Sequence, residues 1–336
     1  MVKTGIIGIG KMGISHLAIL GAHKDVTVAG VCDTSKMMLD AIEKYSPFPC
    51  FTDYRKMLDT AKPDAVVVAV PTKFHASMVS ELLDRNIHVF VEKPFCLKAD
   101  EAPALIEKAR AKKLVNQVGY HNKFIGTFRE VKRMVKAGAI GEIYHFHGQS
   151  YGPVVVKTKQ ESWRTNPEEG GGCLMDYASH IIDLINDILS PVEKVNSSQL
   201  KSIFSREVDD AVYAMMELRN KVSGILSVNW SDDTFRKMST SITLNGSKGK
   251  IISDANELKI YFKEKEAPEG YSTGWNVKYV TDLTEPVDYY LRGEEYSAQL
   301  DYFVQSVKGT RPNLINTFES AALTDKAISM IRKAQS

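Results

Sequence analysis

Short apolar runs alternate with amphipathic stretches from the N-terminus to about Tyr120. The runs are rich in β-branched residues and nearly continuous, which is typical of parallel strands covered on both faces. They lie at Thr4–Ile9, Val26–Cys32, Ala65–Val70, His88–Val91 and Leu114–Gly119. The stretches between them have helical periodicity and lie at Met12–Leu20, Lys36–Tyr45, Ala76–Arg85 and Lys98–Lys112. This β-α alternation predicts an α/β fold with a doubly wound parallel sheet, the Rossmann arrangement.

The pattern changes after Tyr120. A helical stretch at 124–137 precedes a strand near 142–149, and a long polar loop at about 151–172 leads into a stretch with Asp176 and His180. Short strands separated by turns follow, at Ala211–Leu218, Gly224–Trp230, Ser239–Asn245, Lys250–Ser253 and Leu258–Phe262. Asn245-Gly246 and Lys248-Gly249 indicate hairpin turns. We therefore predict a C-terminal α+β domain with an open, mostly antiparallel sheet.

A chain of 336 residues favours two domains. We place a nucleotide-binding domain at residues 1–120 and a second α/β domain, for substrate binding and oligomerisation, at 121–336. The tail at about 294–332 is helical again and could pack back on the first domain.

Composition and charge limit the partners and the cellular location that we expect. The net charge of +2 offers no global attraction for nucleic acid or an anionic membrane, so neither is an expected partner. The apolar runs are far shorter than a bilayer span. The N-terminus enters a strand directly, which argues against a signal peptide. The four cysteines have no disulfide or zinc spacing, so we expect a cytoplasmic protein with reduced thiols and no metal.

The segment Gly8-Ile9-Gly10-Lys11-Met12-Gly13 fits the pattern G-x-G-x-x-G between a strand and a helix. In that context the first glycine makes a tight turn, the second lets the backbone approach a pyrophosphate, and the third permits close helix packing. Asp33 ends the second strand, where a carboxylate binds the adenosine ribose and repels a 2′-phosphate. We count Thr34 and Lys36 with this site. NAD is favoured, and Lys36 leaves NADP possible.

Two later loops also follow parallel strands, whose carboxyl ends border the ligand in such sheets. The first, Val70-Pro71-Thr72-Lys73-Phe74-His75, is a candidate for cofactor contact, although Thr72 could equally cap a helix and His75 could merely cap or pack. The second, Glu92-Lys93-Pro94, places a charged pair at a buried strand end. Lys93 could stabilise negative charge on a substrate oxygen, or the pair could be structural.

Asp176 and His180 lie four residues apart, after the glycines 170–172. On a helix the two side chains share one face. Histidine is well suited to proton transfer near neutral pH. The glycines would let the backbone lie close to a cofactor or substrate.

These motifs, in this order, resemble those of the glucose–fructose oxidoreductase / inositol dehydrogenase / MocA family of NAD(P)-dependent enzymes, over essentially the whole chain. The combination of Glu92-Lys93-Pro94 with Asp176-x-x-x-His180 is the specific part. The resemblance implies that Lys93, Asp176 and His180 are the catalytic residues. It also implies that the C-terminal sheet forms a homodimer or homotetramer, and that substrates are mostly cyclic polyols, sugars and sugar nucleotides.

The resemblance further implies that Pro71, Thr72, His75 and Glu92 line the nicotinamide side. Weaker candidates for substrate contact are Tyr120, Asn122, Trp163 and Arg164; many relatives carry arginine near Asn122, whereas this chain has Lys123, so the match is partial. Trp163 could stack on a sugar and Arg164 could bind a hydroxyl, carboxylate or phosphate. A basic cluster of Lys157, Lys159 and Arg164 would suit a phosphate but could simply be solvated. Asp183 is expected to be a solvated or capping acid.

The chemistry that the candidate residues can perform agrees with the resemblance. Oxidation of a secondary alcohol needs a hydride acceptor, a base and a group that polarises oxygen. The first hypothesis is an NAD(P)-dependent dehydrogenase or reductase acting on CH–OH groups, here a ring hydroxyl of a sugar or nucleotide sugar, with inositol or another polyol as the alternative. The second is a dinucleotide-binding sensor without turnover. The third is reduction of a non-sugar carbonyl or imine.

Overall fold

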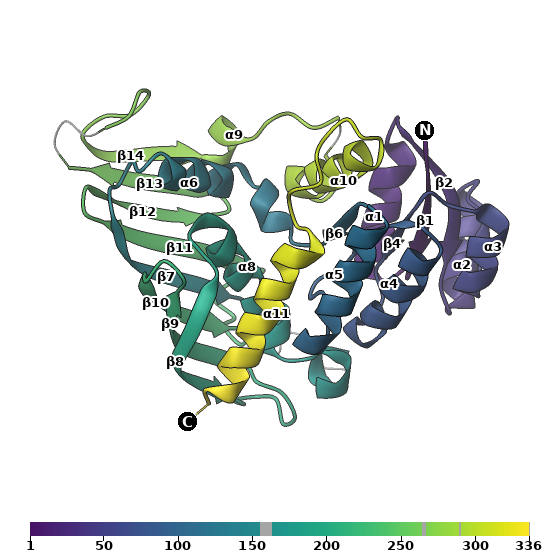
Figure 1. The fold of residues 1–336 in the computed structure, drawn as a ribbon, viewed down its shortest axis with the longest axis horizontal. Coiled ribbons are helices and arrows are strands. Elements are labelled where there is room, and N and C mark those ends of the chain that lie inside the picture. Colours follow the sequence, from purple (N-terminus) through teal and green to yellow (C-terminus); the bar gives the residue numbers. More distant parts are fainter. Residues whose placement is uncertain (155–162, 264–266, 289, 336) are drawn as a thin grey trace. The chain divides into compact units, whose positions relative to one another are not determined.

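The computed structural model describes residues 1–154, 163–263, 267–288 and 290–335. The chain forms two compact units (Figure 1). Unit 1 comprises Met1–His121 and Val287–Ala322, and unit 2 comprises Asn122–Pro286 and Leu323–Ser336. The chain therefore passes between the units three times, after His121, after Pro286 and after Ala322, inside the last helix.

Unit 1 is built on a six-stranded sheet in which all pairings are parallel. The strands are β1 (Val2–Ile7), β2 (Val26–Cys32), β3 (Cys50–Phe51), β4 (Ala65–Val68), β5 (His88–Val91) and β6 (Asn116–Val118). Their order in the sheet is β3-β2-β1-β4-β5-β6, which is the doubly wound arrangement. The predicted Rossmann fold is confirmed.

Helices cover both faces of this sheet. They are α1 (Lys11–Ala22), α2 (Lys36–Tyr45), α3 (Tyr54–Ala61), α4 (His75–Asp84), α5 (Ala102–Ala111), α10 (Glu294–Val307) and the start of α11 (Phe318–Lys333), with 3₁₀ turns at Thr72–Phe74 and Ala99–Glu101. Alternate strand residues pack into two apolar layers: Val67 and Phe90 face Leu20 of α1 and Phe303 of α10, whereas Val68 faces α4, α5 and α11. Full burial on both sides explains why these strands are continuously apolar.

Unit 2 is built on an eight-stranded sheet, in the order β14-β13-β12-β11-β7-β10-β9-β8. The strands are β7 (Ile143–Tyr151), β8 (Val192–Lys201), β9 (Ala211–Leu218), β10 (Ser223–Asn229), β11 (Ser239–Gly246), β12 (Gly249–Asp254), β13 (Glu257–Phe262) and β14 (Gly274–Tyr279). All its pairings are antiparallel except β7 with β10. The predicted mostly antiparallel sheet is confirmed, and its β11–β12 hairpin turns between Asn245 and Lys250, as expected.

One face of this sheet is covered by helices and the other is open. A 3₁₀ turn at His121–Phe124 leads into α6 (Gly126–Lys136), which packs on β12 and β13, while α8 (Ser179–Ile188) packs on β7 and β11 (Figure 1). The short α9 (Val280–Leu283) follows β14. Side chains alternate between buried and accessible along β11 to β13, as one covered face requires. The open face carries exposed apolar side chains at Tyr213, Met215, Ile225, Trp275, Val277 and Tyr279.

The apolar pattern did not predict β3, α3, β8, β14 and the short α9. β3 is only two residues long. β8 and β14 are the edge strands of the second sheet, and most of their side chains are at least partly accessible, so the apolar signal is weak. The cap of α3, Asp53 accepting from the Lys56 N–H at 3.0 Å, is the N-terminal signal that could have indicated that helix.

A buried carboxylate organises the start of β9. Asp210 is fully buried, and one of its oxygens accepts three backbone N–H bonds from residues 203–205 at 2.6–2.8 Å. The other accepts from Ser205 Oγ and from Trp230 Nε1, at 2.6 and 2.8 Å. Burial by itself acts to raise the pKa of Asp210, but these hydrogen bonds outweigh it and lower the pKa below its usual value.

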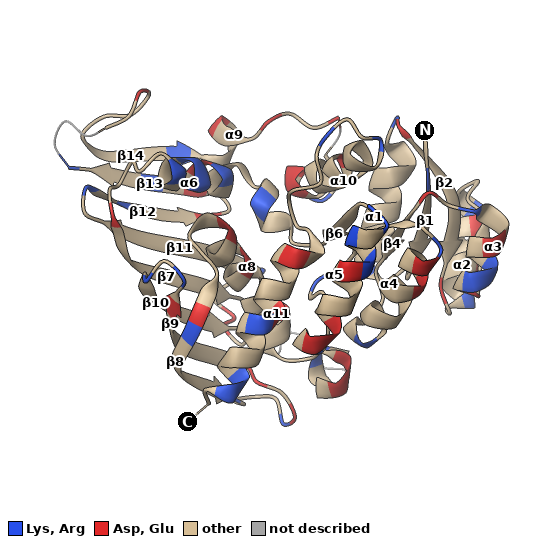
Figure 2. Ribbon diagram, viewed as in Figure 1, with Lys and Arg blue, Asp and Glu red and all other residues tan. Residues whose placement is uncertain are grey.

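Figure 2 shows residues of both charge signs interspersed over the helices and strands of each unit. Among the residues that the structure describes, no helix combines the length and apolar composition needed to cross a bilayer. In the same part of the chain, no three His, Cys, Asp or Glu side chains are grouped to hold a metal ion, and no disulfide joins the four cysteines.

We predict that Asp210→Asn destabilises unit 2 by about 2–3 kcal/mol at neutral pH, because an amide cannot accept all five hydrogen bonds. Since the folded-state pKa of Asp210 is lowered, its contribution is present above the unfolded-state pKa and is lost as pH falls through the folded-state value. The difference from the parent should therefore narrow below about pH 4. Denaturant unfolding at several pH values measures it. Asp254→Asn is the matched control, since that carboxylate caps an accessible turn at Asn256 and Glu257; an equal loss there would contradict the prediction.

Candidate active site

The glycine-rich loop joins β1 to α1 with almost no spare volume. Gly8 has φ +92°, and a Cβ there would lie 2.5 Å from the Ala69 carbonyl oxygen. A Cβ on Gly13 would overlap the Gly8 carbonyl oxygen, so the first turn of α1 packs directly on the loop. Gly10 differs, because a Cβ there would meet no heavy atom within 4 Å. Two glycines thus shape the loop, and the third faces open space.

In a G-x-G-x-x-G loop, the position of Gly10 is where the backbone approaches the pyrophosphate of a dinucleotide. Gly10 is the N-cap of α1 and no side chain caps the helix, so its first N–H groups remain available to an anion. Asp33 lies at the end of β2, where its Oδ2 accepts from the Ile9 N–H at 2.6 Å and its Oδ1 from the Ser35 N–H at 2.7 Å. Thr34 and Lys36 lie beside it and are exposed. The loop and the acid are therefore bonded to each other before any ligand binds.

The loop after β4 is held by a buried histidine. His75 is 1% exposed; its Nε2 lies 2.9 Å from the Val70 carbonyl oxygen and its Nδ1 lies 3.0 Å from that of Pro94. Burial lowers the pKa of His75, and the neutral ring donates only one N–H. Its packing role, one of the roles expected from the sequence, thus joins two loops. Thr72 is buried in the turn, whereas Pro71 is exposed.

The turn after β5 carries the charged pair predicted to be functional. Glu92 is buried, and its Oε1 lies 2.6 Å from Nε2 of the buried His16 of α1. Its Oε2 accepts from the Lys93 N–H at 3.2 Å. Burial acts to raise the pKa of Glu92, but the hydrogen bond and charge of His16 and the charge of Lys93 bring it below its usual value. Glu92 is therefore an ionised anchor at the base of the half-buried Lys93.

In unit 2, Asp176 and His180 lie on consecutive turns of one helical segment. Leu174–Ala178 forms a π-helical turn that continues into α8, and both side chains are buried. Single π-turns inside helices occur often at functional sites. Asp209 caps this segment, since its backbone and side-chain oxygens accept from the N–H groups of Cys173 and Leu174, at 2.8 and 2.6 Å. The helix is thus tied to the start of β9.

The close approach that the neighbouring glycines permit is to the protein's own chain. Gly171 and Gly172 donate to the Asn166 and Arg164 carbonyl oxygens, at 2.9 and 3.1 Å. A Cβ on Gly172, at φ +103°, would lie 2.6 Å from Asp209 Oδ1. These contacts fold the preceding turn back onto the helix start.

Arg164 binds the candidate catalytic carboxylate. Its Nε donates to Asp176 Oδ2 at 2.9 Å, and its guanidinium lies 4.6 Å from the centre of the Trp163 ring. The three residues form one connected group within unit 2. The structure thus gives Arg164 a protein partner that the sequence did not indicate. Lys157 and Lys159, the other members of the expected basic cluster, lie outside the described residues.

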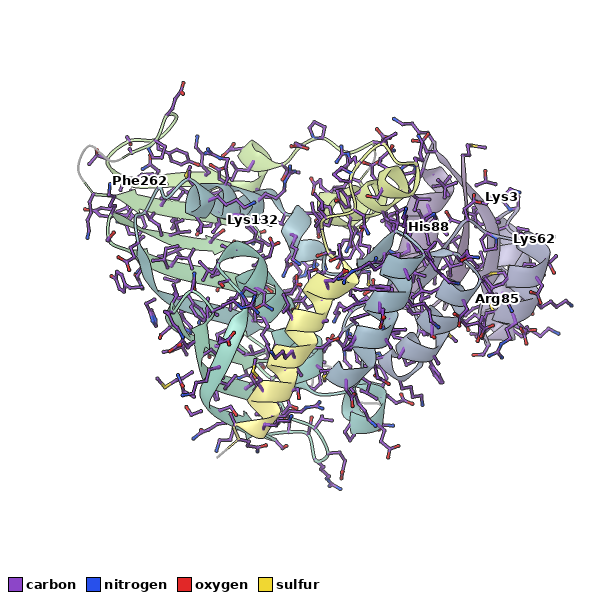
Figure 3. All side chains as sticks on the ribbon, in the orientation of Figure 1. Lys3, Lys62, Arg85, His88, Lys132 and Phe262 are labelled. Carbon is purple, nitrogen blue, oxygen red and sulfur yellow. The ribbon has the colours of Figure 1, made fainter. Side chains whose placement is uncertain are left out.

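Asp183 is not the solvated acid that we expected from the sequence. It is 1% exposed and its Oδ1 lies 2.8 Å from Lys123 Nζ, which is also buried. Burial raises the pKa of Asp183 to about 6, with Lys123 opposing the shift. The expectation was wrong because α8 is buried along most of its length, which its apolar spacing alone did not reveal. One turn on, Lys132 Nζ lies 2.6 Å from Asp187 Oδ1, and Lys132 is labelled in Figure 3.

The candidate residues therefore fall into two sets. Unit 1 carries the glycine loop, Asp33, the loops after β4 and β5, and the buried Tyr120. Unit 2 carries the buried Asn122 together with Trp163, Arg164, Asp176 and His180. Two further residues that build these sets escaped the sequence argument, His16 and Asp209, and the ion pair of Lys123 with Asp183 was not predicted either. A histidine on the apolar face of α1, and two consecutive acids before an apolar strand, were the available signals for the first two.

Comparison with known proteins gives the same division. Residues 2–120 match the family model described as an oxidoreductase family with an NAD-binding Rossmann fold, and residues 128–252 match the GFO/IDH/MocA C-terminal domain. The chain is 27% identical to D-glucoside 3-dehydrogenase of Escherichia coli (strain K12) over 254 residues, which are 69% of this chain and 70% of that protein. It is 23% identical to myo-inositol 2-dehydrogenase of Thermotoga maritima, over 94% of this chain and 90% of that protein.

The fold is also found among solved structures. Levoglucosan dehydrogenase in complex with NADH superposes with a TM-score of 0.87 over 99% of this chain and 96% of that one, at 18% identity. At this identity the likeness establishes the fold.

The geometry of the glycine loop predicts opposite effects for two similar substitutions. Gly10→Ala places a methyl group in the open space before α1 and should weaken NADH binding about tenfold or more, with little change in melting temperature. Gly13→Ala forces α1 away from the Gly8 carbonyl and should lower the melting temperature by several degrees. NADH fluorescence titration and thermal unfolding of both variants measure the two effects. Unchanged NADH affinity in a folded Gly10→Ala variant would contradict this assignment of the loop.

Proposed function

The chain belongs to the GFO/IDH/MocA oxidoreductase family, with an NAD-binding Rossmann domain, and from that premise we propose that it transfers a hydride between nicotinamide and a ring secondary alcohol or ketone of a sugar or nucleotide sugar. The observation that carries the proposal is the buried pair of Asp176, on the π-turn, and His180, in the first turn of α8, with Asp176 bound by Arg164. Two relatives named as glucoside and inositol dehydrogenases support a cyclic polyol as substrate.

We assign three catalytic roles. His180 takes the hydroxyl proton during oxidation and returns it during reduction. The ammonium group of Lys93 donates a hydrogen bond to the reacting oxygen and stabilises the charge that develops there. Asp176, held by Arg164, accepts a hydrogen bond from a neighbouring substrate hydroxyl.

When bound, NAD supplies the hydride acceptor and NADH the donor. The residues that would hold it are the glycine loop at 8–13, Asp33 with Thr34 and Lys36, and the loops after β4 and β5. Asp33 favours NAD because a 2′-phosphate would meet its carboxylate. Its two bonds to backbone N–H groups keep that carboxylate in place. Lys36, exposed at the start of α2, is the group that would support NADP.

Substrate recognition is assigned to Trp163, Arg164, Asn122 and Tyr120. Trp163 would stack on the apolar face of a sugar ring. Arg164 already neutralises Asp176, so a phosphate would have to share its guanidinium with that carboxylate. This argument favours a neutral sugar over a nucleotide sugar as the substrate, with inositol as the alternative.

The proposal predicts that His180→Gln lowers hydride transfer by about 10²–10⁴-fold and that Lys93→Met lowers it by about 10²–10³-fold, with NADH binding nearly intact. NADH formation is followed with sugars, inositols and nucleotide sugars, and the rate constants are measured on the best substrate. His88→Gln and Lys62→Met, at positions labelled in Figure 3, serve as matched controls in unit 1 and should leave the rate unchanged.

Three outcomes separate the alternatives. Near-parent rates in either catalytic variant would refute the assignment. Tight NADH binding without turnover on any polyol would favour the dinucleotide sensor instead. Activity confined to carbonyls or imines without neighbouring hydroxyls would replace the sugar substrate with a different class.

We further propose that the open face of the unit 2 sheet binds a second copy of the chain. Cross-strand register places Met215 beside Ile225 on one face, and the same row continues across the sheet to the exposed Val277. Between Ile225 and Val277 the row passes through His147, Thr243, Ile252 and Lys259, so the exposed apolar side chains lie toward its two ends. Exposed apolar side chains grouped on one sheet face are typical of an interface. The symmetric match of one sheet face to itself suits a homodimer, or a homotetramer of such pairs.

Accordingly, the double variant Met215→Lys/Ile225→Lys should shift the protein to monomer, because two buried cations would face their symmetry mates. Light scattering coupled to size exclusion measures the mass. Leu314→Lys, at an exposed apolar position of unit 1, is the control and should keep the parent mass. A parent protein that is already monomeric would contradict the assembly without bearing on the catalytic assignment.

A further inference from the structure

The helix that starts at the glycine loop reaches directly to the turn that carries Lys93. His16 lies three residues after Gly13 on α1 and is fully buried. Its Nε2 lies 2.6 Å from Glu92 Oε1, and its ring packs edge-on against Phe90 at 5.3 Å. The contact therefore joins α1 to the end of β5 inside unit 1.

Glu92 has little freedom to leave this position. Its second oxygen accepts from the Lys93 N–H, and its own N–H donates to the Val68 carbonyl at 2.9 Å. Gly119 of the neighbouring strand end leaves room for the carboxylate, since a Cβ there would lie 2.9 Å from Oε2. On the far side of Lys93, the buried His75 ring packs against the Pro94 carbonyl, whose oxygen lies 3.0 Å from Nδ1. The Lys93 turn is thus fixed from both ends.

His16 is the side chain whose hydrogen bond to the Glu92 carboxylate the structure shows. His121 is near enough to feel the charges of Glu92 and His16, but burial lowers its pKa to about 4, so it is neutral at physiological pH. It stacks on Tyr296, which also lies beneath the Arg292 guanidinium. A buried carboxylate that lost its bond to His16 would turn toward the cation joined to it in sequence, the side chain of Lys93.

We propose that His16 is a positioning residue for Lys93: by holding Glu92, it couples the dinucleotide-binding loop to the orientation and availability of the Lys93 amine. The proposal rests on the catalytic role assigned to Lys93. It differs from a purely structural role for the pair, which would stabilise unit 1 without altering the behaviour of Lys93.

The test measures the Lys93 amine without requiring turnover. The full chain is acetylated with an excess of an N-hydroxysuccinimide ester at mildly alkaline pH, and the rate at Lys93 is read by peptide mass spectrometry relative to the exposed Lys62. His16→Leu should slow labelling of Lys93 about tenfold, because an ion pair with the released Glu92 occupies the amine. His16→Gln, which retains an N–H donor near the position of Nε2, should stay within about twofold of the parent.

The matched control lies at the other end of the same helix. His23 Nε2 lies 3.2 Å from Asp301 Oδ1, so His23→Leu removes a second histidine–carboxylate contact that is remote from Lys93 in unit 1. It should leave the Lys93 rate unchanged. If His16→Leu does not fold, Gly119→Ala presses on the same carboxylate from the opposite side and should slow labelling in the same direction.

A second measurement tests the coupling between the dinucleotide-binding loop and Lys93. ADP-ribose occupies the dinucleotide loop without a nicotinamide ring, so it changes Lys93 labelling only through the protein. It should alter the rate at least about twofold in the parent and His23→Leu, and not in His16→Leu. Parent-like labelling in both His16→Leu and Gly119→Ala, or no effect of ADP-ribose on the parent, would overturn the proposal. Failure of the catalytic assignment is seen separately, as full hydride transfer by Lys93→Met.

Discussion

The contact between Gly13 and the Gly8 carbonyl is the constraint on which unit 1 depends. Because neither residue has a side chain, α1 begins directly against the end of β1, and its first N–H groups face the open space at Gly10. The same seating brings His16, one turn on, to Glu92. A loop usually described only as a phosphate site therefore also sets the distance between α1 and the Lys93 turn.

Parallel strands extend this constraint to the rest of the cofactor side. Their carboxyl ends meet at one edge of the sheet, so residues far apart in sequence come together there. Asp33 accepts from the Ile9 N–H, and the His75 ring lies between the Val70 and Pro94 carbonyl oxygens, 2.9 and 3.0 Å from its two nitrogens. The loops after β1, β2, β4 and β5 are thus cross-linked by side chains, which makes the site rigid before a ligand arrives.

In unit 2, carboxylates fix the candidate residues. Two consecutive acids do the anchoring: Asp209 caps the helical segment that carries Asp176 and His180, and Asp210 holds the turn before β9. Arg164 then fixes the Asp176 carboxylate from the preceding turn. His180, the candidate proton-transfer residue, therefore lies on a helical segment whose start is capped by Asp209 at the beginning of β9.

The sequence by itself determined those features that depend on neighbouring residues in the chain. Continuous apolar runs indicated the buried parallel strands, and the glycine spacing indicated the dinucleotide loop, because both patterns arise within a few residues of chain. The edge strands β8 and β14 and the buried state of Asp183 needed the fold, since partial exposure blurs periodicity and burial depends on distant neighbours. Only the tertiary structure could pair His16 with Glu92, Arg164 with Asp176 and Lys123 with Asp183, because each pair joins separate elements that compact packing alone brings within hydrogen-bonding distance.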